Sequence, residues 1–236
     1  MQLPGRQLDF LKELAKTQTP IVLVLQNGRP LSLTWEQEHV PAILECWYPG
    51  EKGGRAVAEV LFGKTAPSGR LPMSFPKSVG QVPCNYNRMP GGGRRYVETD
   101  WNPLYPFGYG LTYTSFSYSD LEIDAKDLRA SDVEVGAEAT VSFTVTNIGD
   151  TFGEETAQVY LRDEYASVVK PRKELAGFQK VALQPGESYR VSVKLGTRQL
   201  RTLNMKYEWH VEPGDFTVMV GDNAANVLLK GKFSIA

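Results

Sequence analysis

The pattern of apolar and polar positions changes character near residue 100. Before that point, segments with the 3.6-residue period of a helix alternate with short continuous apolar runs. Helices are predicted over 5–16 and 51–62, and Gly63 stands where a glycine commonly ends a helix. Strands are predicted at 21–26, 41–47 and 70–75. A succession of strand, helix, strand and helix is typical of an α/β protein with a mostly parallel sheet.

From residue 116 to the end, apolar residues recur at every second position, which is the period of a half-exposed strand. Turn-forming residues interrupt this pattern at 148–153, 184–187 and 212–215. Seven strands are predicted, at 118–123, 139–147, 157–163, 175–183, 189–195, 216–221 and 227–235. Short strands with regularly spaced turns are typical of a β-sandwich. Its predicted core consists of Val141, Phe143, Val145, Val159, Leu161, Phe178, Val191, Val193, Phe216 and Val218.

The two halves meet in an aromatic segment, NPLYPFGYGLTYTSF at 102–116. Its prolines lack a backbone donor and its glycines admit positive φ, so no regular element is expected there. The same segment carries more aromatic surface than a free linker could leave in water. We therefore expect it to pack against its surroundings, through Tyr105, Phe107, Tyr109, Tyr113 and Phe116.

Several short sequence motifs resemble those of glycoside hydrolase family 3, the β-glucosidase and β-xylosidase group. The motif PFGYGLTYT (106–114), with the aromatic Phe116 two residues further on, resembles the domain junction of that family. The stretches at 3–33 and 41–83, together with Tyr86-Asn87, resemble the second half of its α/β sandwich domain. KELAGFQKVALQPGES (173–188) and PGDFTVMVGDNAANV (213–227) resemble its C-terminal fibronectin type III-like domain. The matches follow the order of the family and cover essentially the whole chain.

This resemblance implies a fold of class α/β plus all-β. Residues 1–101 are expected to form the C-terminal half of the family's α/β sandwich domain, with a mostly parallel sheet and a long loop at 77–101. Residues 102–117 would form the aromatic junction rich in proline and glycine. Residues 118–236 would form a fibronectin type III-like β-sandwich.

The resemblance also implies that the chemistry lies elsewhere. Family members begin with a (β/α)₈ barrel that carries an aspartate nucleophile, and their glutamate acid/base lies shortly before the segment that matches LPGRQ. Here that segment begins at Leu3, so both carboxylates are expected to be missing and no catalytic residue is assigned. The chain is expected to be the C-terminal fragment of an exo-acting β-glycosidase, with β-glucosidase favoured, that hydrolyses terminal β-D-glucosyl residues with retention. Alone, it is expected to be inactive.

Two kinds of partner follow from this interpretation. In the complete enzyme, the substrate would be a β-linked oligosaccharide or glucoside. The α/β part is expected to expose apolar surface, covered by the missing N-terminal barrel portion or by a second chain. The alternative is a carbohydrate-binding or purely structural accessory module. Against an autonomous glycan module, Trp209 is the only tryptophan after Trp101.

The predicted loop at 77–101 holds the candidate sugar contacts. Few apolar residues anchor it, and long loops are usually either functional or disordered. Aromatic rings stack on the C–H faces of sugars, while carboxylates can accept hydrogen bonds from sugar hydroxyls. For the two rings, a packing role and a sugar contact stand about equal. The candidates are Tyr96, Glu98, Asp100 and Trp101.

Other polar and aromatic residues have structural explanations that we favour. Glu45 lies within a predicted buried strand and therefore needs a partner, for which Arg29 is a candidate. Trp47 and Tyr48 follow that strand at its carboxyl end, where α/β proteins bind ligands, but packing against the missing barrel is favoured. The adjacent carboxylates at 154–155 and 163–164 are expected on the charged outer face of the sandwich.

Composition excludes several other classes. A formal net charge of −1 gives no field for nucleic acid or an anionic membrane, and the longest apolar run is far too short to span a bilayer. His39 and His210 stand alone, and Gly63-Lys64-Thr65 follows a helix instead of opening one, so neither a metal nor any cofactor is expected. Cys46 and Cys84 could pair, although two thiols are favoured. No secretory signal opens the sequence, so the compartment stays open: periplasmic or secreted if the parent enzyme carries a signal peptide, otherwise cytoplasmic.

Overall fold

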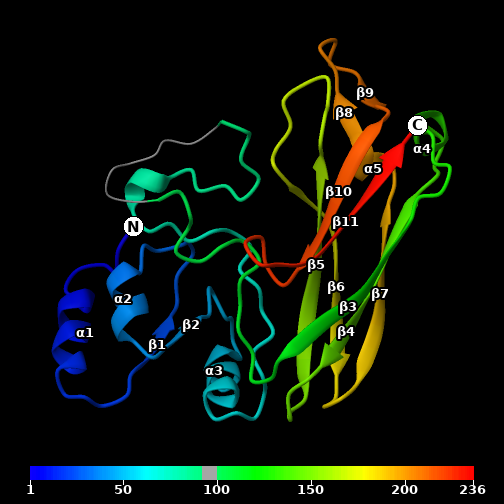
Figure 1. The fold of residues 1–236 in the computed structure, drawn as a ribbon. Helices are drawn as coiled ribbons and strands as arrows, with labels where there is room; N and C mark the ends of the chain where they lie inside the picture. Colours follow the sequence, from blue (N-terminus) through cyan, green and yellow to red (C-terminus); the bar gives the residue numbers. More distant parts are fainter. Residues whose placement is uncertain (92–99) are drawn as a thin grey trace. The chain divides into compact units, whose positions relative to one another are not determined.

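A computed structural model describes residues 1–91 and 100–236 of the chain (Figure 1). The described residues divide into two compact units. The first unit contains Met1–Thr65, Pro72–Asn85 and 100–106, and the second contains Ala66–Leu71, 86–91 and 107–236. Each unit is therefore built from several stretches of the chain. The predicted domain limits at 101 and 117 stay predictions about the family's domains.

The first unit contains a short parallel sheet with helices. Strand β1 (Val22–Leu25) pairs in parallel with β2 (Ala42–Glu45). The helices are α1 (Gln7–Ala15), α2 (Thr34–His39) and α3 (Gly53–Leu61), followed by the 3₁₀ turn η1 (Val79–Gln81). The two predicted helices are thus present as α1 and α3, while α2 was not predicted. The expectation of a mostly parallel sheet rests here on one pair of strands.

The strand predicted at 70–75 was wrong. Only an isolated antiparallel bridge forms there, between Phe75 and Tyr105 in the first unit. Pro72 lies within the stretch and Pro76 follows it, and neither can donate to a ladder, so regular pairing cannot extend through it. Phe75 itself is buried, and its ring lies 6.1 Å from that of Tyr105 in an edge-on arrangement.

The second unit is an antiparallel β-sandwich of two main sheets (Figure 1). One sheet has the order β11-β10-β5-β6, and the other has the order β3-β4-β7. A separate hairpin, β8–β9, was not predicted. Two short helices, α4 (Ala130–Glu134) and α5 (Thr197–Leu200), lie between strands. The strands are β3 (Phe116–Asp124), β4 (Ala139–Asn147), β5 (Gly153–Asp163), β6 (Glu174–Leu183), β7 (Ser188–Leu195), β8 (Arg201–Leu203), β9 (Trp209–Val211), β10 (Gly214–Gly221) and β11 (Val227–Ile235).

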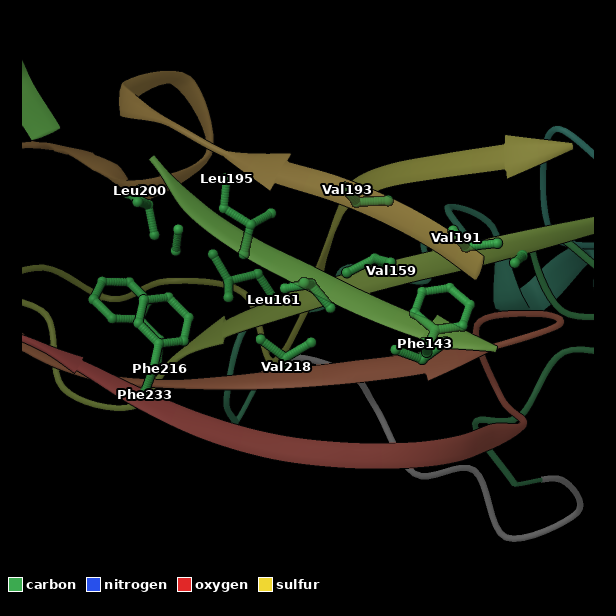
Figure 2. Packing of buried hydrophobic residues seen from close by; sticks show 14 of the residues in the cluster. Phe143, Val159, Leu161, Val191, Val193, Leu195, Leu200, Phe216, Val218 and Phe233 are labelled. Carbon is green, nitrogen blue, oxygen red and sulfur yellow. The ribbon is translucent and has the colours of Figure 1, made fainter. Parts of the chain in front are cut away.

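The core of the sandwich is formed by inward-facing side chains of both sheets (Figure 2). On β4, residues alternate strictly between buried and half-buried, so Val141, Phe143 and Val145 all face inward. Full burial of side chains of this size contributes about 1.5–3 kcal/mol each before entropy is subtracted. Every predicted core residue is buried except Phe178.

Phe178 was wrongly predicted to be in the core, since its side chain is 65% exposed. It pairs with Gln158 and shares the outer face of β6 with Lys180. The neighbouring inward position is Gly177, which pairs with Val159. A Cβ on Gly177 would lie 2.5 Å from Cγ1 of Val193, so the opposite sheet approaches too closely for any side chain there.

The part of the aromatic segment that belongs to the second unit packs onto the outer face of β5. Phe107 stacks on Tyr86 with ring centroids 4.4 Å apart, and Tyr86 also lies edge-on to the buried Tyr160. Gln158 donates a hydrogen bond to the carbonyl of Gly108 at 3.1 Å. The φ of Gly108 is +80°, and a Cβ there would collide with the Gln158 amide, so only glycine fits. The prediction that this segment is packed holds for these residues.

Candidate functional site

Asp100 is one of the two predicted sugar contacts that the structure describes. Its carboxylate accepts a hydrogen bond from Lys77 Nζ at 2.8 Å and from the backbone N–H of Asn102 at 3.0 Å. Gln81 donates to the Asp100 carbonyl at 2.9 Å. The ammonium of Lys77 lowers the pKa of Asp100 below its ordinary value. These contacts hold an exposed, ionised carboxylate in a fixed place within the first unit.

Of the other three candidates, the structure describes only Trp101. Trp101 follows Asp100 directly and is half-buried. Tyr96 and Glu98 lie outside the described residues. A role in sugar binding stays a prediction for all four.

A second group of polar residues lies where β1 and β2 end. Glu45 closes β2, and its two carboxylate oxygens accept hydrogen bonds from Asn27 Nδ2 at 3.1 Å and from the backbone N–H of Trp47 at 3.0 Å. Partial burial raises the pKa of Glu45, and both hydrogen bonds oppose that rise. The partner is therefore Asn27 and not Arg29, whose backbone N–H instead donates to Asn27 Oδ1 at 3.0 Å.

The same carboxylate fixes the turn that follows. Trp47 has a φ of +51°, which is strained for a residue with a side chain, and its N–H is held by Glu45. The Trp47 ring packs against Phe75 with centroids 5.9 Å apart. Tyr48 is then directed to the surface, where its ring lies over the backbone of Gly28. Tyr48 therefore lies exposed at the carboxyl end of the parallel pair of strands, the edge at which α/β proteins bind ligands.

The adjacent carboxylates of the sandwich do not form catalytic pairs. Successive strand residues point to opposite faces of a sheet. Accordingly, Glu154 points outward to Lys180 at 2.6 Å, whereas Glu155 points inward. The expectation that both lie on the outer face is therefore wrong for Glu155, which is buried. Asp163, with a nearly buried side chain, likewise pairs with Lys170 at 3.3 Å.

Glu155 is buried because Arg70 and Tyr118 neutralise and solvate it. Arg70 Nη2 lies 2.5 Å from Glu155 Oε2, and the Tyr118 hydroxyl donates to Oε1 at 2.9 Å. Arg70 also donates to the carbonyl of Gly110. Burial raises the pKa of Glu155, while the charge of Arg70 and the two hydrogen bonds lower it. This network fastens the segments around residues 70 and 110 to the sandwich.

The remaining residues considered for metal or cofactor chemistry make local contacts within their own units. His39 stacks on Trp35 at 4.4 Å, and His210 lies 2.9 Å from Glu212. Gly63 has a φ of +71° after α3, which is a helix-ending glycine. Within residues 1–91 and 100–236, no cluster of three metal-ligating side chains occurs. In the same part of the chain, no disulfide joins Cys46 and Cys84, and none of the helices has the length and apolar sequence needed to span a bilayer.

Comparison with known proteins gives the fold and these sites their context. Residues 1–113 match the model of the glycosyl hydrolase family 3 C-terminal domain, and residues 155–224 match that of the fibronectin type III-like domain. A β-xylosidase of Formosa agariphila is 45% identical over 225 residues, which is 94% of this chain and 30% of that protein. A periplasmic β-glucosidase of Salmonella typhimurium is 41% identical over 244 residues, 99% of this chain and 31% of that protein.

Solved structures of β-glucosidases show the same fold. A β-glucosidase from Erythrobacter marinus superposes with a TM-score of 0.93 at 39% identity, over 100% of this chain and 30% of its own. A β-glucosidase from Listeria innocua in complex with glucose gives 0.92 at 36% identity, over 100% and 33%. The fold and matches define the C-terminal region of a glycoside hydrolase. The chain belongs to glycoside hydrolase family 3, as a C-terminal portion that spans about 30% of the length of its curated relatives.

Proposed function

We propose that this chain is the C-terminal part of an exo-acting β-glycosidase, with β-glucosidase the favoured activity. The observation that carries the proposal is the end-to-end match to β-glucosidases and β-xylosidases in both sequence and structure. Structures of the Listeria innocua relative hold glucose and, in a variant, laminaribiose, which favours a terminal β-D-glucosyl residue as the substrate. Hydrolysis would proceed with retention.

The nucleophile and the acid/base belong, in this proposal, to an N-terminal portion. Retaining hydrolysis needs two carboxyl groups about 5–5.5 Å apart across the glycosidic bond. In the described part of the chain, Glu154 and Glu155 point to opposite faces, and Asp100 is engaged with Lys77. The chain alone should therefore not hydrolyse glycosides.

The first unit would supply contacts to the N-terminal portion and to sugar. A two-stranded parallel sheet is normally part of a larger covered one, yet Phe10, Val22 and Phe62 are exposed. We propose that the N-terminal portion covers these three side chains. Sugar contacts are assigned to Asp100 and Trp101, with Tyr96 and Glu98.

Turnover of chromogenic aryl β-glucoside and β-xyloside tests the proposal. The highly purified chain should give no turnover, and adding the N-terminal portion, in trans or as one chain, should restore it. Asp100→Asn and Glu98→Gln should then raise KM in the restored enzyme. Activity that co-purifies with the chain alone and disappears in either variant would contradict the proposal, because this loop would then carry catalysis.

A further inference from the structure

The β8–β9 hairpin presents a rigid turn at one end of the sandwich (Figure 1). Asn204 organises the turn: its Oδ1 accepts hydrogen bonds from the backbone N–H of Lys206 at 2.8 Å and of Glu208 at 3.0 Å. The Asn204 N–H also donates to the Glu208 carbonyl at 3.0 Å. Such a side-chain-capped turn loses most of its conformational freedom before any ligand arrives.

The hairpin is also fastened to the rest of the second unit. Lys170 Nζ donates to Thr202 Oγ1 at 3.1 Å and to the Arg201 carbonyl at 3.3 Å. The N–H of Val211 donates to Glu134 at 3.1 Å, which ties β9 to α4. The position of the turn is therefore set by the sandwich core, because Val211 is buried in it.

This rigid hairpin displays aromatic rings to solvent. Tyr207 is 85% exposed and has a φ of +64°, and Trp209 is 58% exposed within β9. The Arg201 guanidinium lies 4.2 Å from the centroid of the Trp209 ring, which holds the indole in one orientation by cation–π attraction. Neither ring belongs to the core of the sandwich. Two exposed aromatic faces on a fixed scaffold can bind a ligand with little loss of conformational entropy.

The arrangement of polar groups indicates what binds. Lys206 and Glu208 alternate with Tyr207 and Trp209, so each ring is flanked by charged groups instead of joining one apolar patch. The centre of a protein interface is depleted in such charges. A sugar ring has an apolar C–H face surrounded by hydroxyls, and it matches an aromatic face flanked by charged hydrogen-bonding groups.

We propose that the hairpin 201–211 is a secondary binding site for a β-linked glucan chain. Trp209 stacks on one sugar ring, Tyr207 contacts a neighbouring residue, and Glu208 and Lys206 bond to hydroxyls. The choice of a β-glucan rests on the proposed function. The site holds the polymer on the sandwich and uses none of the residues assigned to sugar contact in the first unit.

Affinity electrophoresis of the purified chain in gels with soluble mixed-linkage β-glucan tests this. The glucan should retard the wild-type chain, while gels with the α-linked polymer dextran should not. Trp209→Ala and Tyr207→Ala should each weaken retardation about fivefold to tenfold. Phe178→Ala, which removes another exposed aromatic ring from the same unit, should leave it unchanged.

Three results would overturn the inference: no retardation of the wild-type chain, equal retardation of Trp209→Ala, or self-association that Trp209→Ala abolishes without affecting glucan binding. The last would make the hairpin a contact between copies of the chain. Aryl β-glucoside hydrolysis by the restored enzyme separates this inference from the proposed function. Trp209→Ala should leave that turnover unchanged, whereas absence of turnover in the wild-type enzyme would count against the proposed function alone.

Discussion

Replacing Arg70 with methionine should destabilise the second unit strongly, because it leaves the carboxylate of Glu155 buried without its cation. The two side chains are only 11% and 3% exposed, and their charged atoms lie 2.5 Å apart. After Arg70→Met, Glu155 keeps a single hydrogen bond, from Tyr118. Breaking a buried ion pair from one side costs about 3–5 kcal/mol. Domains of this size are stable by about 5–15 kcal/mol, so the loss is a large fraction of the total.

The cost should also depend on pH. Burial raises the pKa of Glu155 above its ordinary value of 4.5, and the charge of Arg70 opposes that rise. Without Arg70, the pKa in the folded state rises further. A raised carboxyl pKa means that the folded state binds the proton more tightly, so stability falls as pH rises from the unfolded pKa through the folded one. The deficit of Arg70→Met should therefore be largest near pH 8 and shrink toward pH 5.

Hydrogen exchange of the Val159 and Leu161 amides in β5 measures the opening free energy of this unit without a signal from the first. Arg190→Met is the matched control, since Arg190 also lies 2.5 Å from a carboxylate, that of Glu122, but the two side chains are 38% and 77% exposed. Exposed pairs contribute about 0–1 kcal/mol. The reasoning is refuted if both variants lose the same stability, or if the Arg70→Met deficit does not change with pH.

Three further predictions concern single positions. Gly177→Ala should lower the free energy of unfolding in urea by about 1–3 kcal/mol, because the added Cβ would collide with Val193. Gly54→Ala in α3 should raise it by about 0.5–1 kcal/mol, because a Cβ there meets nothing within 4 Å. Effects of the same sign in the two variants would contradict this reasoning. Lys77→Gln should raise the pKa of Asp100 toward its ordinary value in an NMR titration, and an unchanged pKa would show that Lys77 is not the cause. The carboxyl of Glu45 has a raised pKa in the folded state, so the stability of the first unit should fall as pH rises above 4.5. Glu45→Gln should reduce this fall, and an unaltered pH profile of stability would show that Glu45 does not cause it.

The sandwich could be predicted from the sequence because its signals are local. On β4, burial follows apolarity at each residue from Ala139 to Thr146. The prediction that Phe178 is buried failed near an irregularity in strand pairing. The register between β5 and β6 shifts between Val159 and Tyr160, and Gly177, next to Phe178, takes the inward position. The β8–β9 hairpin was missed because strands of three residues are too short to show a period.

The sites were harder to predict because their partners are distant in sequence. The sequence showed that Glu45 needs a partner, but Asn27 and Arg29 both follow β1, and only the backbone geometry decides between them. Glu155 looked like an outer-face charge, because carboxylates are rarely buried unless they are paired. Its partner Arg70 lies 85 residues away, beyond the reach of any local pattern.

The division of the chain into units has a consequence for how this region is inherited. Residues 66–71 and 86–91 belong to the sandwich unit, although residues 72–85 between them belong to the other. No single crossover point along the gene therefore separates the two units. A crossover between residues 66 and 106 would combine, within each unit, stretches from two different parent proteins. Recombination among family members should transfer this region as one cassette, and chimeric enzymes should be built with junctions outside it.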